Sequence, residues 1–148
     1  MTETGSMLYY EDLTVGDEWE PGSVIFTREE IVEFAKRYDP QPFHLDDTAA
    51  ERHFDGVIAS GWHTAAACMR PFAEEVLTDV AIIAALGIDD LVWRRAVRPD
   101  DELSIMVTLY DKQPWDDDRG RITFQLRAEN TGGELVHKRL DKVLVERR

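Results

Sequence analysis

Apolar residues in the N-terminal third of the chain follow the spacing of one helical face. Positions i, i+3, i+4 and i+7 of this pattern are Ile31, Phe34, Ala35 and Tyr38. Thr27 precedes the segment, and Glu30 follows three residues later, which is the pattern of a capping box. The spacing therefore predicts an amphipathic helix that ends near residue 38.

The next segment predicts two more helices. A short helix follows Asp46 or Asp47, either of which can cap its N-terminus. A longer helical run follows Ser60 and Gly61, and its first turns contain four small residues in succession, which indicates close packing on several sides. Pro71 lies inside this run and cannot donate a backbone hydrogen bond, so we expect a kinked or two-part helix.

From about residue 88 onward the hydrophobic period changes to two, as in β-strands. Four alternating stretches are separated by turn signals: 90–97, 102–113, 120–131 and 134–148. Their short connections predict an antiparallel meander of four consecutive strands. An earlier apolar run at residues 23–26 predicts an edge strand. Together these elements predict an α+β domain with a helix laid across one face of the sheet.

Length and composition bound the class of protein. A chain of 148 residues with 43% hydrophobic residues is expected to form a single domain over residues 1–148, with residues 1 to about 8 as a flexible tail. It contains neither an apolar run of about 18 residues nor the pattern of a signal peptide, so we expect a cytoplasmic protein without a membrane partner. The single cysteine, Cys68, allows no internal disulfide and reads as a small core residue.

Charge excludes one class of partner. The formal net charge is −13, whereas nucleic acids and anionic lipids are bound by clustered lysine and arginine. We therefore expect no nucleic-acid partner. An anionic substrate would have to be met by a local group of arginines rather than by the overall field of the protein.

The stretch "YDPQPFHLD" carries the candidate chemistry. Pro40 and Pro42 fix the backbone around Asp39 and His44, and Pro42 lies between the two polar residues. A helix-ending carboxylate and a structural histidine are the ordinary interpretations of each residue taken alone. Taken together, they place a carboxylate and an imidazole five positions apart on a stiffened backbone.

A metal or cofactor is not expected. His53 and His63 could join the pair in "YDPQPFHLD", but their spacing matches no standard set of metal ligands. Both histidines are therefore interpreted as structural or pocket-lining residues.

Four motifs, in this order and spacing, resemble the MaoC-like dehydratases, a family that includes (R)-specific enoyl-CoA hydratases. They are "EDLTVGDEWEPGS", "DPQPFHLD", "FDGVIASGWHTAAACMR" and "VRPDDEL". The similarity runs from about residue 9 to the C-terminus. It implies the hot-dog fold, in which an antiparallel sheet wraps around a long central helix. It also implies active sites at a dimer interface, and hence a homodimer or a larger assembly of dimers.

The resemblance also assigns roles to residues. The family's catalytic aspartate and histidine fall on Asp39 and His44, and its helix-start glycine, whose N–H contacts the thioester oxygen, falls on Gly61. The family's asparagine is replaced by Gln41, which is one methylene longer. The expected substrate-binding residues are Gly61, Gln41, Ser60 and His63.

The function implied is reversible addition of water to a trans-2-enoyl-CoA, giving an (R)-3-hydroxyacyl-CoA; a substrate on acyl carrier protein is the less expected form. Two alternatives remain open, because the hot-dog fold also hosts thioester hydrolysis. They are an acyl-CoA thioesterase and a non-catalytic subunit that binds acyl thioesters. Arg94, Arg95 and Arg98 are candidates for contact with a CoA phosphate, although solvated strand faces also explain them.

Overall fold

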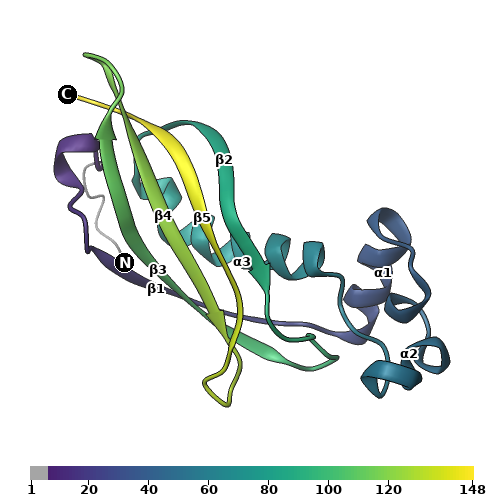
Figure 1. Ribbon diagram of the computed structural model, residues 1–148. Helices are drawn as coiled ribbons and strands as arrows, with labels where there is room; N and C mark the ends of the chain where they lie inside the picture. The colour runs from purple at the N-terminus through teal and green to yellow at the C-terminus, as the bar shows by residue number, and fades with distance from the viewer. Residues whose placement is uncertain (1–6) are drawn as a thin grey trace.

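A computed structural model describes residues 7–148 as one antiparallel sheet with a long helix against it (Figure 1). The strands are β1 (Glu18–Ile25), β2 (Ile82–Trp93), β3 (Glu102–Pro114), β4 (Arg119–Glu129) and β5 (Leu135–Glu146). The helices are α1 (Arg28–Tyr38), α2 (Asp47–Phe54) and α3 (Gly61–Glu75). Three short 3-10 turns complete the chain: η1 (Tyr10–Asp12), η2 (Pro42–His44) and η3 (Leu77–Asp79).

The order of strands in the sheet corrects one prediction. The order is β1-β3-β4-β5-β2, so only β3, β4 and β5 form a meander of consecutive strands. β2 is not the neighbour of β3; it crosses to the far edge and pairs with β5, where Trp93 lies opposite His137. β2 also begins at Ile82, earlier than predicted, because its first half is continuously apolar and carries no period of two.

The helices follow their local signals. The hydroxyl of Thr27 accepts a hydrogen bond from the N–H of Glu30 at 3.1 Å, and the Glu30 carboxylate accepts from the N–H of Thr27 at 3.3 Å. The predicted capping box is therefore confirmed. α3 runs as one helix through Pro71 from Gly61 to Glu75, so the two-part helix is not observed.

The core lies between α3 and the sheet. Cys68 and Phe72 of α3 are fully buried, and the Phe72 ring meets that of Phe124 of β4 edge-on, with centroids 5.5 Å apart. Burial raises the pKa of the Cys68 thiol to about 12, so the thiol stays protonated at neutral pH. Cys68 is a core residue, as predicted.

The two ends of the described chain lie beside each other in space. Of the predicted tail, residues 1–6 lie outside the described residues, whereas Leu8 forms an isolated parallel bridge with Val80. Near the other terminus, the guanidinium of Arg148 pairs with Asp12 at 2.7 Å. No helix within residues 7–148 is long and apolar enough to cross a membrane.

Candidate active site

The loop after α1 carries the two candidate catalytic side chains. Asp39 is the C-cap of α1, where its N–H donates to the carbonyl of Ala35 at 2.9 Å. Pro42 opens the 3-10 turn η2, which ends at His44. The prolines thus end one helix and begin the next turn, and the six residues from Asp39 to His44 place both side chains on the same side of the loop.

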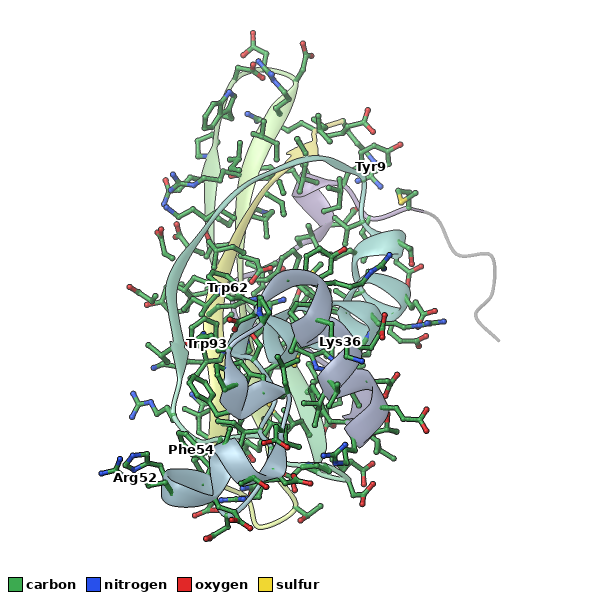
Figure 2. All side chains as sticks on the ribbon, turned by 90° about the vertical axis from the view of Figure 1, so that its right-hand side faces the viewer. Tyr9, Lys36, Arg52, Phe54, Trp62 and Trp93 are labelled. Atoms are coloured by element: carbon green, nitrogen blue, oxygen red, sulfur yellow. The ribbon has the colours of Figure 1, made fainter. Side chains whose placement is uncertain are left out.

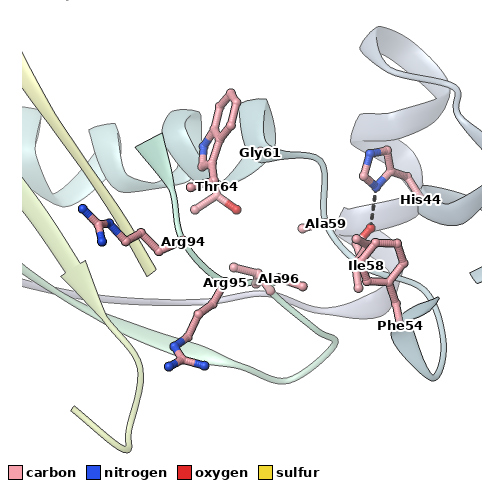
Figure 3. Close-up of a pocket in the computed structure, with 11 residues that line it drawn as sticks. His44, Phe54, Ile58, Ala59, Gly61, Thr64, Arg94, Arg95 and Ala96 are labelled. Carbon is pink, nitrogen blue, oxygen red and sulfur yellow. Dashed lines mark hydrogen bonds between the residues drawn. The ribbon is translucent and has the colours of Figure 1, made fainter. Parts of the chain in front are cut away.

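The Asp39 carboxylate and the His44 imidazole face each other. Nε2 of His44 lies 3.3 Å from Oδ2 of Asp39, and the two side chains are 6% and 17% exposed respectively. Nδ1 of His44 lies 2.7 Å from the carbonyl oxygen of Ile58 (Figure 3). A carbonyl only accepts, so Nδ1 carries a proton, and Nε2 is the ring nitrogen that faces the carboxylate. One water molecule can hydrogen-bond to both groups at this separation.

The surroundings of Asp39 favour its ionised form. Burial raises the pKa of Asp39, but the side chains of Gln41, Ser60 and His44 together lower it by more. The pKa of Asp39 therefore lies below its ordinary value. The amide of Gln41 donates to Oδ1 of Asp39 at 2.7 Å. The longer side chain of Gln41 therefore still orients the carboxylate, which leaves Oδ2 toward His44.

The N-terminus of α3 lies beside this pair. Ser60 is the N-cap, is fully buried, and accepts from the N–H of Trp62 at 3.2 Å. Gly61 is the first residue of the helix, so its N–H has no acceptor within the helix and lies at the positive end of the helix dipole. A Cβ at Gly61 would lie 2.5 Å from the ring carbons of Trp93, so any larger residue there would have to displace the indole.

A cavity of about 260 Å³ joins His44 to Gly61 (Figure 3). The other residues that line it are Phe54, Ile58, Ala59, Thr64, Trp93, Arg94, Arg95, Ala96 and Val97. Most of them were not predicted, because the loop after β2 reaches the cavity only when β2 has paired with β5 at the far edge of the sheet. Trp93 is the last residue of β2 and precedes two arginines, which is the one local hint of its position.

The three candidate arginines occupy two different positions in the structure. Arg94 and Arg95 line the cavity, and the Arg95 guanidinium also pairs with Glu134 at 2.8 Å. Arg98 instead donates to the backbone carbonyl of Phe54 at the end of α2. This bond ties α2 to the loop before β3, which is a structural role.

His63 is not brought to the same cavity. Its ring stacks on that of Phe34, with centroids 4.9 Å apart, and it lines a separate cavity of about 450 Å³ with Ile25 and Glu30. Burial lowers the pKa of His63, although the nearby Glu30 opposes this. Within residues 7–148, no three histidine, cysteine or acidic side chains form a group that could bind a metal ion.

The sheet wrapped around α3 is the hot-dog fold, which the solved (R)-hydratases share. The chain belongs to the MaoC-like dehydratase family. The family model described as MaoC like domain matches residues 13–130. The resemblance found in the sequence is thereby confirmed.

Individual relatives cover nearly the whole chain. Uncharacterized protein YdeM of Bacillus subtilis (strain 168) is 32% identical over 138 residues, which are 93% of this chain and 98% of that protein. A MaoC-like dehydratase from Rhodospirillum rubrum superposes with a TM-score of 0.86 at 40% identity, covering 95% of this chain and 98% of that one. The (R)-hydratase PhaJ1 from Pseudomonas aeruginosa gives a TM-score of 0.76 at 25% identity, covering 96% and 88% respectively. The family and these neighbours support hydratase or dehydratase activity.

Proposed function

We propose that the protein adds water reversibly to a trans-2-enoyl-CoA and forms the (R)-3-hydroxyacyl-CoA. The observation that carries this proposal is the Asp39–His44 pair, 3.3 Å apart, with His44 in the same cavity as Gly61. The carboxylate and imidazole can activate water, and the free N–H at the start of α3 can stabilise negative charge on the thioester oxygen.

The reaction follows from the positions of these groups. Water bound between Asp39 and His44 forms a bond to Cβ through its oxygen and gives one proton to the pair. Electrons of the double bond move toward the thioester oxygen, which accepts a hydrogen bond from the N–H of Gly61. The pair then delivers one proton to Cα, so one water is consumed and both side chains return to their starting states. Hydroxyl and proton arrive on the same face, which is syn addition; the (R) product is inferred from the family.

The CoA form of the substrate is supported by the arginines of the cavity. Arg94 and Arg95 lie on its lining, and guanidinium groups bind phosphate through charge-assisted hydrogen bonds. Because the protein carries a net charge of −13, such a local group is needed to offset repulsion of an anionic substrate.

The second part of the proposal is a homodimer joined along β2. Ile83, Leu86 and Ile88 of this edge strand are 44%, 42% and 48% exposed. An edge strand with exposed apolar side chains and unpaired backbone groups is stabilised by pairing with another strand. A second copy of β2 would supply that strand.

The test is hydration of crotonyl-CoA by the purified protein. We expect the enoyl-thioester absorbance to fall without release of free thiol, whereas release of thiol would indicate a thioesterase. Asp39→Asn and His44→Ala should each reduce kcat/KM by about 10²–10⁴-fold. His53→Ala, an exposed histidine on α2, is the matched control and should keep full activity.

Three further outcomes would contradict the proposal. If the losses of the two single variants multiplied in the double variant, Asp39 and His44 would act independently rather than on one water. Rapid oxidation of the product by an (S)-specific 3-hydroxyacyl-CoA dehydrogenase with NAD would exclude the (R) assignment. Binding of crotonyl-CoA with no chemistry would indicate a non-catalytic binding subunit.

A further inference from the structure

Trp93 occupies an unusual position at the end of β2. Its ring lies directly over the Cα of Gly61, where no space remains for a Cβ, and it meets the Trp62 ring edge-on with centroids 5.2 Å apart (Figure 2). It therefore forms the side of the cavity next to the N–H proposed to bind the thioester oxygen.

A buried polar network stands behind the Trp93 ring. The imidazole of His137 stacks on it with centroids 6.4 Å apart and an angle of 20° between the planes. Nδ1 of His137 lies 3.1 Å from the carbonyl of Val92, and Nε2 lies 3.0 Å from the Arg139 guanidinium. His137 is 0% exposed and Arg139 is 3% exposed. The space behind Trp93 is thus filled rather than empty.

The network also fixes α3 relative to the sheet. The Arg139 guanidinium donates to the carbonyl of Ala65 at 2.9 Å and to the Asp141 carboxylate at 2.8 Å. It contacts the sulfur of Met69 at 2.9 Å as well. Since Arg139 links β5 to two turns of α3, and His137 links β5 to β2 beside Trp93, the ring cannot move backward without breaking buried hydrogen bonds.

The direction of the acyl chain follows from size. The nucleotide part of CoA is too large for a cavity of about 260 Å³, which is below the roughly 300–1,000 Å³ typical of drug-sized ligand pockets, so it stays at the open side. The acyl group then extends inward from His44 and Gly61. Thr64, which is 2% exposed, and Trp93 line the same cavity and are the walls available to it.

We propose that Trp93, backed by His137 and Arg139, is a specificity-determining residue that restricts the substrate to short acyl groups. The inference rests on the proposed function, because it names the acyl class of that same site. Each methylene that a pocket does not accommodate typically costs about 10–200-fold in kcat/KM. A chain of four carbons fits before the indole, whereas a chain of eight carbons collides with it.

The test compares crotonyl-CoA with trans-2-octenoyl-CoA. For the unchanged protein we expect kcat/KM to be at least about 100-fold higher for the four-carbon substrate. Trp93→Ala should lower this preference by about 10-fold or more, and Trp93→Leu should give an intermediate value. Trp115→Ala is the matched control, because Trp115 is 51% exposed at the β3–β4 turn and does not line the cavity.

A binding measurement separates this inference from the proposed reaction. Calorimetry with butyryl-CoA and octanoyl-CoA, which cannot be hydrated, should show the same length preference and the same relaxation in Trp93→Ala. If the protein hydrates neither enoyl substrate but binds with this preference, the proposed reaction fails and the inference stands. Equal use or binding of both lengths by the unchanged protein, or an unaltered preference in both folded Trp93 variants, would overturn the inference.

Discussion

Arg139 provides a test of stability that is independent of any activity. Its side chain is 2% exposed, and its nitrogens contact Asp141, Ala65, His137 and Met69. Arg139→Ala would leave the Asp141 carboxylate, itself 9% exposed, without its ion pair. Removing one partner of a buried pair costs about 3–5 kcal/mol, which is about a fifth or more of the roughly 5–15 kcal/mol that stabilises a typical domain.

The size of the effect has an upper limit set by protonation. Burial raises the pKa of Asp141 even with the neighbouring guanidinium present, which opposes that rise. Without Arg139 the carboxyl group would take up a proton instead of remaining charged, so we expect a cost near about 3 kcal/mol at neutral pH. For a chain of this size that loss lowers Tm by about 6–12 °C.

The assay is urea unfolding monitored by circular dichroism. The slope of the free energy of unfolding against urea concentration should be the same for all variants. Arg139→Met combined with Asp141→Leu removes both charges and keeps apolar volume, so it should be within about 1 kcal/mol of the unchanged protein or more stable. The reasoning is refuted if Arg139→Ala costs less than about 1 kcal/mol, or if the double variant is as unstable as the single one.

Three other predictions concern pH, the helix start and assembly. Burial and the Arg139 charge lower the pKa of His137 to about 4 from 6.5, so folding disfavours its protonation. The contribution of His137 to the free energy of unfolding is therefore complete above about pH 6.5 and falls by up to about 3 kcal/mol as the pH drops to 4. Urea titrations at several pH values should detect this loss, and His137→Asn should reduce it. Gly61→Ala should displace the Trp93 ring and reduce kcat/KM by about 10²-fold, with crotonyl-CoA hydration as the measurement. Light scattering at micromolar concentration should give the mass of a dimer, and Leu86→Glu on β2 should shift it toward a monomer, whereas a monomeric unchanged protein would contradict the β2 interface.

Local patterns in the sequence were sufficient for α1 and for the loop that follows it. The Thr27–Glu30 capping box and the helical face are determined by neighbours in the chain, and so is the approach of Asp39 to His44 across five residues. The position of β2 was not predictable in the same way. Its partner β5 lies about 50 residues away, and the choice between the two edges of the sheet depends on how the sheet wraps around α3.

The cavity likewise combines residues that local sequence patterns predict with residues that only the complete fold brings together. Its chemical groups come from short motifs, whereas the lining residues 93–97 come from the end of β2 and the loop after it, which reach Gly61 only when the whole sheet is formed. His63 illustrates the reverse case: it is two residues from Gly61 in the chain, yet the turn of α3 directs it toward Phe34 and a different cavity. Proximity in sequence along a helix does not imply a shared face.

The position of Asp39 as the C-cap of α1 also has a consequence for how related chains vary in length. One residue inserted into α1 would rotate everything after it by about 100° and advance it by about 1.5 Å, so Asp39 and His44 would move together, away from their positions beside the start of α3. A deletion would do the same in the opposite sense. The acidic turn between β3 and β4 carries no such constraint, because it lies on the surface and contributes nothing to the cavity. Insertions and deletions among relatives are therefore expected at residues 115–118 and not between residues 28 and 39.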